Sequence, residues 1–385
     1  MKNIKYIPFH KPTIPKEVIT SIKGSLDSGW ITTGPKVKRF EKALSEIITK
    51  NNIVATSSCT SALHTAYTIS DINKGDEVIV PSFTFCSTIN MLVNIGAVPI
   101  FVDIDENSYC IDPNDIEHRI TKKTKAIVVV HYAGMPADMS KINKIAKKYK
   151  LIIIEDAAHA FTSIYKGKFI GSSKNLTCFS FYATKNFTTA EGGAIVCSNI
   201  KQENRARIFI NHGISKNAST RYAQGGTYQY DVLSPGYKYN LSDIHASIGL
   251  SQLPYQKVFR KQRLNIVNRY KNGLINNNYL ILPTDPPYPN STHAWHLFTI
   301  QILPSSKCTR DELFSFLMQN KIGTSVHYIP NHLQTYYKGK NKVHLPITEK
   351  IASRIISLPL YESLSNTNVD RIIKLINYAT KNGIK

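Results

Sequence analysis

The sequence predicts an α/β protein, in which a large domain with a mostly parallel sheet precedes a smaller α+β C-terminal domain. Short apolar runs rich in β-branched residues recur between residues 50 and 200, and polar, helix-like segments separate them. Runs that are apolar on both faces are typical of strands covered by helices on each side. After about residue 200 the pattern changes to a polar loop, a long amphipathic segment and a different mixture of strands and helices.

The expected strands of the large domain follow one another at regular intervals. They are residues 76–85 (DEVIVPSFTF), 97–105 (AVPIFVDID), 125–134 (KAIVVVHYAG), 150–160 (KLIIIEDAAHA), 176–185 (LTCFSFYATK) and 192–198 (GGAIVCS). Strands that alternate with helices form parallel neighbours joined by crossover helices. Ligands of such sheets bind beyond the carboxyl ends of the strands, so we expect the functional residues there.

The amphipathic segment 241–274 is expected to link the two domains. We place the large domain at residues 1–250, with the N-terminal arm included, and the small domain at 251–385. The small domain is predicted from the strand-like 293–303 and from the helix-like 310–322 and 368–382. The sequence contains no internal repeat and no low-complexity tract.

Composition excludes several classes of protein. The chain has 385 residues, of which 42% are hydrophobic and 10% aromatic, as in a soluble globular protein. It lacks an apolar run of the roughly 18 to 20 residues that a membrane helix needs, and the N-terminus lacks the apolar core of a signal peptide. We therefore expect a cytoplasmic protein without membrane association. The six cysteines show neither paired nor metal-like spacing, so we expect no disulfide and no metal.

The formal net charge of +22 raises the possibility of nucleic-acid binding. The lysines are scattered along the chain, however, and the short basic runs are typical of solvated helix and loop faces. A basic protein also attracts small anionic substrates. The charge therefore indicates a negatively charged ligand, and we expect no nucleic-acid partner.

Three polar features lie where expected strands end. Asp156 ends one apolar run, Thr60 and Ser61 open an apolar-periodic helix, and Lys185 follows a strand that ends at Ser180. Each has an ordinary explanation when taken alone. Aspartate, serine and threonine are common helix caps, and most lysines are exposed surface residues.

Taken together, the three features fit pyridoxal 5'-phosphate (PLP). A helix N-terminus with hydroxyl side chains binds phosphate, a lysine forms a covalent bond with the cofactor's aldehyde, and a carboxylate keeps the ring nitrogen protonated. Phe85 offers a flat ring that would stack on the cofactor, although core packing explains it equally well.

The chain also resembles the DegT/DnrJ/EryC1 family of sugar-nucleotide aminotransferases over essentially its whole length. The matching segments occur in the family's order: SGWITTGPKVKRFE, SSCTSALHTA, GDEVIVPSFTFCST, GAVPIFVDID, VVVHYAGMPADM, IEDAAHA, FSFYATKN, AEGGAIV, PGYKYNLSDIHASIGLSQL, HAWHLF and GTSVHYIPNHLQTYY. Three of these look most like the members that place an amino group on C4 of UDP-4-keto-L-arabinose for lipid A modification. They are HYAGMPADM, PGYKYNLSDI and HAWHLF.

The resemblance implies a PLP-dependent transferase of fold type I, similar to aspartate aminotransferase, that works as a homodimer with shared active sites. It assigns roles to eight cofactor residues: the PLP-binding lysine Lys185, the ring-nitrogen partner Asp156, His159 near the phenolic oxygen, the phosphate binders Thr60, Ser61 and Ser180, the stacking Phe85, and Lys238 reaching a phosphate across the interface. Lys238 departs from the family, in which many members have asparagine. The division of that role between Lys238 and Asn240 stays open.

The resemblance also implies substrates: L-glutamate as amino donor, with 2-oxoglutarate as its product, and a nucleotide-linked keto sugar. The segments expected to line the sugar pocket contain Trp30, Thr32, Thr33, His327, Tyr328 and His332. Trp30 and Tyr328 are equally explained as packed aromatics. Relatives with histidine in place of the lysine are dehydratases, so Lys185 favours amino transfer. Transfer to C3 of the sugar and a non-catalytic regulatory or nucleic-acid-binding protein remain alternatives.

Overall fold

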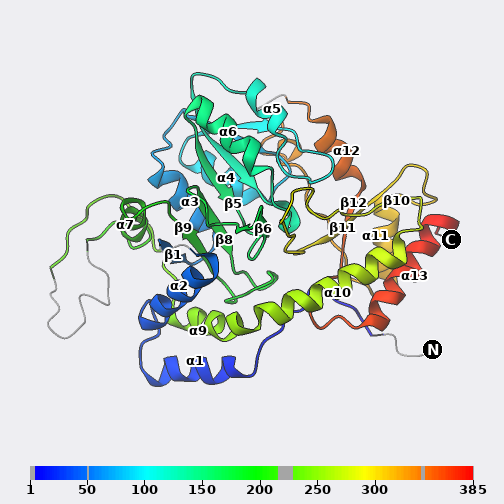
Figure 1. Cartoon of the computed structure of the whole chain (residues 1–385), viewed down its shortest axis with the longest axis horizontal. Helices are drawn as coiled ribbons and strands as arrows, with labels where there is room; N and C mark the ends of the chain where they lie inside the picture. Colours follow the sequence, from blue (N-terminus) through cyan, green and yellow to red (C-terminus); the bar gives the residue numbers. More distant parts are fainter. Residues whose placement is uncertain (1–4, 50–51, 216–228, 340–342, 385) are drawn as a thin grey trace.

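A central sheet organises the N-terminal two thirds of the chain (Figure 1). The computed structural model describes residues 5–49, 52–215, 229–339 and 343–384. Within these residues, seven strands form one sheet in the order β1-β9-β8-β5-β4-β2-β3. Their bounds are β1 Ile53–Thr56, β2 Glu77–Pro81, β3 Val98–Val102, β4 Thr124–Val130, β5 Ile152–Asp156, β8 Leu176–Ser180 and β9 Gly193–Val196.

The predicted α/β fold with a mostly parallel sheet is confirmed. Strands β3, β2, β4, β5 and β8 are parallel neighbours, whereas β9 runs antiparallel to β8 and β1. Strand β1 is not among the expected strands, because its four residues lead directly into a hydroxyl-rich turn. The loop 181–192 joins β8 to β9 without a crossover helix, so Ser180 pairs with Gly193. This loop therefore stays at the carboxyl end of the parallel strands and carries Lys185 there.

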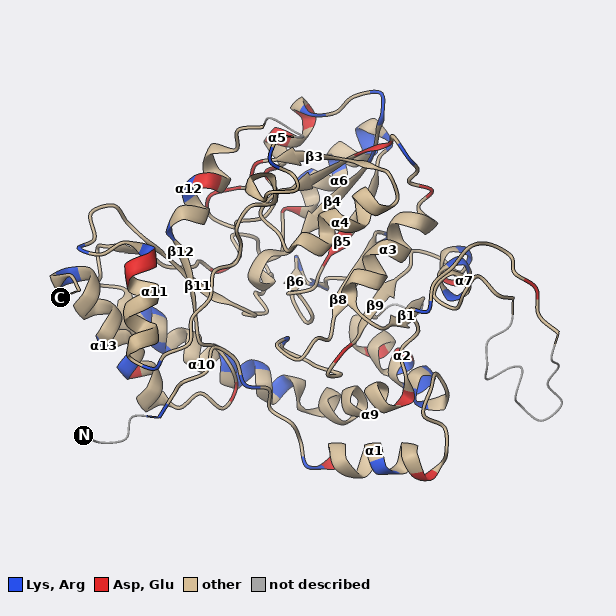
Figure 2. Ribbon diagram, turned by 180° about the vertical axis from the view of Figure 1, so that it is seen from behind, with Lys and Arg blue, Asp and Glu red and all other residues tan. Residues whose placement is uncertain are grey.

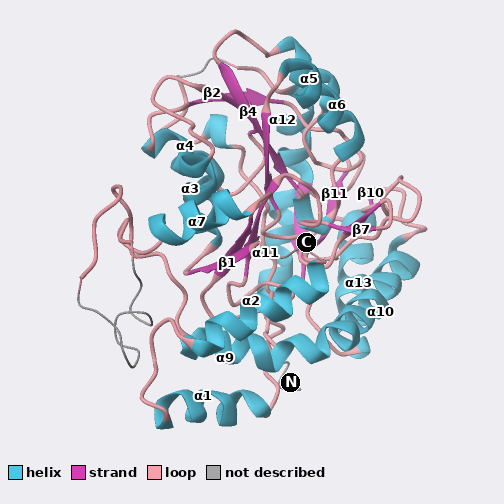
Figure 3. Cartoon of the chain, turned by 60° about the vertical axis from the view of Figure 1, so that its left-hand side comes forward, coloured by secondary structure: helices cyan, strands magenta, loops and turns pink. Residues whose placement is uncertain are grey.

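Helices cover both faces of the sheet (Figure 3). Alternate residues of each strand enter different cores: Val78 and Val80 of β2 pack toward α3 and α4, and Ile79 packs toward α5 and α6. Burial on both faces explains why the strands are apolar throughout. The helices of this part are α1 Glu17–Asp27, α2 Pro35–Ile48, α3 Cys59–Ile69, α4 Cys86–Asn94, α5 Pro113–His118, α6 Met139–Tyr149, α7 Ile200–Phe209 and α9 Asp243–Gln252. A short hairpin, β6 Ile164–Tyr165 and β7 Lys168–Phe169, flanks β5.

The C-terminal part has its own core around a second sheet. In the described residues this sheet has three antiparallel strands, β10 Leu280–Ile281, β11 Phe298–Ile302 and β12 Ile355–Leu358. The helices are α10 Gln256–Leu274, α11 Arg310–Gln319, α12 Pro346–Arg354 and α13 Asn366–Asn382. Within its core Arg263 pairs with Glu362 at 2.7 Å, and both side chains are buried.

The expected linker is a continuous helical segment. Helix α9 packs against α1 and α2, and it continues through the turn η2 Leu253–Tyr255 into α10, which packs against α13 (Figure 1). The N-terminal arm crosses to the other part, because Ile7 pairs with Ile322 and lies in the C-terminal core. The boundary at residue 250 stays a prediction.

Basic residues are spread over the molecule. Figure 2 shows Lys and Arg on helices and loops of both parts, without a single continuous basic stripe. Among the described residues, no helix is long and apolar enough to cross a membrane.

Candidate active site

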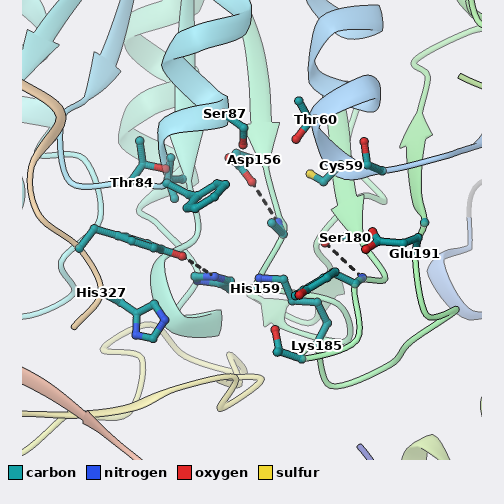
Figure 4. A pocket seen from close by; sticks show the side chains of 18 residues that line it. Cys59, Thr60, Thr84, Ser87, Asp156, His159, Ser180, Lys185, Glu191 and His327 are labelled. Carbon is teal, nitrogen blue, oxygen red and sulfur yellow. Dashed lines mark hydrogen bonds between the residues drawn. The ribbon is translucent and has the colours of Figure 1, made fainter. Parts of the chain in front are cut away.

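A cavity of about 340 Å³ lies at the carboxyl ends of the parallel strands (Figure 4). Its volume is within the range typical of small-molecule sites. The lining residues come from seven segments of the chain: Ser58, Cys59, Thr60, Thr84, Phe85, Ser87, Val130, Asp156, Ala158, His159, Ser180, Tyr182, Thr184, Lys185, Glu191, Gly192, His327 and Tyr328. The topology therefore places eight of the fourteen predicted site residues in one cavity, and six of these eight are predicted cofactor binders.

Asp156 presents its carboxylate to the cavity from the end of β5. It is buried, and it accepts hydrogen bonds from the Thr88 hydroxyl at 2.7 Å and from the Ala158 amide at 3.1 Å. Burial raises the pKa of Asp156, although the two hydrogen bonds and the Lys185 charge oppose this. A cationic partner in the cavity would offset the cost of burying an ionised carboxylate there.

Lys185 enters the same cavity from the loop after β8. A turn, in which the Lys185 amide donates to the Tyr182 carbonyl at 2.9 Å, fixes its backbone. Burial lowers the pKa of Lys185 to about 8, although the Cys59 thiol and Asp156 carboxylate favour its charged form. Lysines with this property act as nucleophiles and bases near neutral pH.

The N-terminus of α3 forms the opposite side of the cavity. Ser58 caps the helix, since its side chain accepts from the Ser61 amide at 3.1 Å and the Ser61 hydroxyl accepts from the Ser58 amide at 3.0 Å. The amides of Cys59 and Thr60 precede the first intrahelical bonds and favour an anion. Ser61 itself is a capping residue in this chain, and it does not line the cavity.

A close contact between strand and helix fixes this N-terminus. A Cβ atom at Gly193 would lie only 2.5 Å from the Ser58 carbonyl carbon and 2.6 Å from the Cys59 nitrogen. Glycine lets β9 approach the first turn of α3, and Ser180 lies beside it in the sheet. Two segments separated by more than a hundred residues thus form one anion-binding cradle.

Aromatic side chains form a third side. Phe85 precedes α4, and its ring is 56% exposed although it lines the cavity. The Tyr328 ring lies 6.0 Å from the Phe85 ring and is stacked on His159 at the same separation. His159 is buried, and burial together with the Lys185 charge lowers its pKa well below the usual range. His327 lies on the same side, and burial lowers its pKa to about 4.

Five predicted residues besides Ser61 do not line the cavity, and His332 is the first of them. Its side chain is buried outside the cavity, 2.7 Å from the Ser82 hydroxyl and 3.2 Å from Glu349. In this chain, His332 links the segment after Tyr328 to β2.

The other four lie on loops near α9. The Trp30 indole donates to the Thr33 carbonyl at 3.0 Å, and the Thr32 carbonyl accepts from the Asp243 amide at 3.0 Å. Thr33 donates its hydroxyl proton to the Leu241 carbonyl at 2.5 Å. Lys238 is exposed, and its backbone pairs with Asn211. These four residues do not line the Lys185 cavity of the described chain.

Several residues in or beside the cavity escaped prediction. Thr88 lies behind the lining and donates to Asp156, yet in the sequence it is an ordinary residue of α4. Glu191 and Thr84 line the cavity. The sequence could not indicate Thr88, because its contact with Asp156 joins residues that are 68 positions apart.

The donor set fits PLP. The α3 cradle suits a phosphate, Lys185 suits an aldehyde, and a protonated ring nitrogen would give the buried Asp156 a cationic partner. Each group of the cofactor would have a matching side chain within one cavity of adequate size.

Comparison with known proteins gives the same assignment. The model of the DegT/DnrJ/EryC1/StrS aminotransferase family matches residues 12–377. The chain is 40% identical to the spore coat polysaccharide biosynthesis protein SpsC of Bacillus subtilis (strain 168) over 385 residues, which cover 99% of this chain and 98% of SpsC.

Solved structures agree. Spr1654 from Streptococcus pneumoniae in its PMP-form has a TM-score of 0.92 and 33% identity, with 98% of this chain and 100% of that chain covered. Its PLP-form has a TM-score of 0.91. Helicobacter pylori PseC, an aminotransferase involved in the biosynthesis of pseudoaminic acid, has a TM-score of 0.91 and 28% identity, with 98% and 99% covered.

Proposed function

Because the chain belongs to the DegT/DnrJ/EryC1/StrS aminotransferase family, we propose that it moves the amino group of L-glutamate to C4 of a nucleotide-linked 4-keto sugar. The observation that carries this proposal is that Lys185, Asp156 and the N-terminus of α3 line one cavity. The enzyme depends on PLP, as its family does. The proposed product serves a cell-surface polysaccharide or lipid A, and we propose the cytoplasm as its site of synthesis.

The cofactor and the chain divide the chemistry. Bound PLP supplies an aldehyde that is exchanged between amines and a protonated ring that withdraws electrons from the reacting carbon. Thr60, Ser180 and the first-turn amides of α3 would hold its phosphate. Asp156 would keep the ring nitrogen protonated, and Phe85 would cover one face of the ring.

Lys185 is the proposed base in both half-reactions. Its lowered pKa leaves part of the Nζ population neutral near neutral pH. In the first half-reaction Nζ takes the proton from the α-carbon of glutamate, the amino group stays with the cofactor, and water releases 2-oxoglutarate. In the second, the keto oxygen of the sugar leaves as water, and Nζ gives a proton to C4 as this carbon receives the amino group. One base thus serves two substrates in turn.

The proposed active unit is a homodimer in which each site uses both subunits. Trp30, Thr33 and Lys238 lie outside the cavity of their own chain. Apolar side chains are exposed nearby: Ile31, Val232 and Leu233 are each more than 50% exposed. A second copy that covers this surface would bring Trp30 and Lys238 to the partner's cavity, with Lys238 at the phosphate.

The main proposal and its alternative differ in the sugar carbon that receives the amino group, C4 or C3. The resemblance of three motifs to enzymes acting on UDP-4-keto-L-arabinose favours C4 and a pentose, with UDP- or dTDP-4-keto-6-deoxyhexoses next. A C3-specific enzyme would have the same cofactor cavity. The basic chain suits a nucleotide diphosphate in either case.

A spectroscopic experiment tests the reaction without knowledge of the product. Glutamate should convert the visible PLP absorption to that of the pyridoxamine form, and a panel of 4-keto nucleotide sugars should restore it at unequal rates. Mass and NMR analysis of the sugar then identify the aminated carbon. Recovery with 3-keto sugars or free keto acids, and with no 4-keto sugar, would refute the C4 assignment.

A further inference from the structure

Hydrogen bonds fix the proton of His159 on one ring nitrogen. The Ala133 amide donates to Nδ1 of His159 at 3.2 Å, so Nδ1 must carry the lone pair. Burial keeps the imidazole neutral, and its single proton is therefore on Nε2. Nε2 lies 2.9 Å from the Tyr328 hydroxyl oxygen, so His159 is the donor in this bond.

This arrangement leaves the Tyr328 hydroxyl proton for another acceptor. An oxygen that accepts from His159 directs its own proton elsewhere. Tyr328 lines the cavity, and burial raises the pKa of its hydroxyl, so the group stays protonated. The Tyr328 hydroxyl is thus a donor that is available inside the cavity.

The loop 131–134 holds both members of the pair. Ala133 has φ of 55°, a left-handed conformation that is costly for alanine and presents its amide to His159. Tyr132, its neighbour, donates to the His327 carbonyl at 2.5 Å and so fixes the segment that carries Tyr328. The buried His131 anchors the loop to β5, because its Nε2 lies 2.9 Å from Glu155.

The substitution pattern of the PLP ring determines which of its groups faces Tyr328. The phosphate arm and the ring oxygen lie on opposite sides of the line from the reactive carbon to the ring nitrogen. Lys185 and Asp156 define the ends of that line, and Cys59, Thr60 and Ser180 lie to one side of it, with His327 on the other (Figure 4). Tyr328 follows His327 and contacts His159, so the ring oxygen faces this pair.

We propose that Tyr328, oriented by His159 and the Ala133 amide, is the hydrogen-bond donor to the ring oxygen of bound PLP. His159 and Ala133 are positioning residues that act through Tyr328. This inference depends on PLP binding and is independent of the identity of the sugar. Its tests use no sugar, so their failure is distinguishable from a failure of the C4 proposal.

NMR of the apoenzyme tests the positioning step. The twelve histidines are labelled with ¹⁵N, and the His159 signals are assigned by their loss in His159→Gln. We expect His159 to be protonated on Nε2 alone and to remain so between about pH 6 and 8, the range in which an unperturbed histidine titrates. A proton on Nδ1, or an imidazolium in this range, would overturn the proposal.

Absorbance of the PLP-bound enzyme tests the donor. A hydrogen-bond donor to the ring oxygen lowers the affinity of this oxygen for the proton that it shares with the lysine nitrogen. Tyr328→Phe should therefore raise the pH midpoint of the visible absorption change by about one unit, the scale of a single hydrogen bond to a charged group. His159→Leu should raise this midpoint by a similar amount. His159→Gln retains an acceptor and a donor, so its midpoint should equal that of the unmodified enzyme.

The matched control is Tyr270→Phe, which also removes a buried tyrosine hydroxyl, bonded at 3.0 Å to the Pro359 carbonyl in the C-terminal core. We expect its midpoint to equal that of the unmodified enzyme. An unchanged midpoint in Tyr328→Phe with PLP bound would overturn the proposal, as would an equal shift in Tyr270→Phe.

Discussion

The two halves of the proposed site differ in their origin: one chain supplies the cofactor cavity, and a second chain is proposed to complete it. On the cofactor side, Lys185, Asp156 and Ser180 converge on a single cavity. The residues proposed to reach the partner's site, Trp30 and Lys238, lie on loops outside it. The first half is a consequence of the sheet, because parallel strands end at one edge. The second depends on the proposed dimer, whose geometry one chain does not contain.

Hydrogen bonds nevertheless hold the end of the loop that carries Trp30. Asp243, at the start of α9, caps a different helix: its carboxylate accepts from the amides of Gly34, Lys36 and Val37 at 2.8 to 3.0 Å. The Trp30 indole packs on Gly34, where a Cβ atom would lie 1.7 Å from the indole nitrogen. The comparison teaches that a segment remote from the cavity is held by its own hydrogen bonds, as the proposed dimer would require.

The largest effect is expected from Lys185→Ala. Loss of the proposed base should lower both half-reactions by about 10³-fold or more, the upper part of the range for acid–base catalysis. Lys185→Arg retains the charge and should be equally inactive. Stopped-flow absorbance measures each half-reaction separately. Turnover within tenfold of normal would show that another group moves the proton.

Asp156→Asn should have the next largest effect. The variant keeps the shape of the site but does not hold a ring proton, so turnover should fall by about 100-fold, as when one electrostatic contact to a transition state is lost. PLP should still bind. Asp103→Asn is the control, because Asp103 is a buried acid that instead accepts from the Thr348 amide at 2.7 Å. It should lower the melting temperature without a selective loss of turnover.

Chemical labelling of the apoenzyme compares Lys185 with ordinary lysines. The unprotonated amine reacts, so the labelling rate of Lys185 should rise with pH to a plateau with a midpoint of about 8. Near neutral pH, Lys185 should react at least about tenfold faster than the lysine of a model peptide, whose pKa is about 10.4. Peptide mass mapping at several pH values gives both curves. A Lys185 curve that coincides with the model-peptide curve would contradict the burial effect.

Trp30→Ala should affect the sugar half alone. We expect KM for the keto sugar to rise about tenfold, equivalent to the loss of one well-placed aromatic contact, while the glutamate half-reaction keeps its rate. Tyr378→Ala removes an aromatic side chain on α13 that is about half exposed and does not line the cavity, and it should change neither value. An equal loss in both half-reactions would indicate that Trp30 supports the fold.

The smallest effect comes from mixing subunits. A dimer of one Lys185→Ala chain and one Lys238→Ala chain contains one site with both native lysines if the sites are shared. Its activity should be about half that of the unmodified dimer. Purification through two different tags ensures that only the mixed dimer is assayed. A mixed dimer as inactive as its parents would place each site within a single chain.

Sequence reasoning reached the cofactor half because its residues follow strands. Asp156 and Lys185 each come at the end of an apolar run that also reports the fold. Ser61 and His332 show the limit. A serine in the first helical turn fits a phosphate site and a capping box equally, and its bond to Ser58 is visible only in the structure. Thr88 and the Ala133 amide depend on contacts between distant segments, which periodicity does not encode.

The contact of Gly193 with Ser58 and Cys59 has a consequence for synthesis on the ribosome. Strand β1 pairs with β9 and adds a single bridge from Thr56 to Asn240, so the cradle needs residues from both ends of this span. A nascent chain that has not yet exposed residue 193 contains Asp156 and Lys185 but has no finished anion site. We therefore expect the nascent chain to bind the cofactor tightly only after β9 has left the exit tunnel.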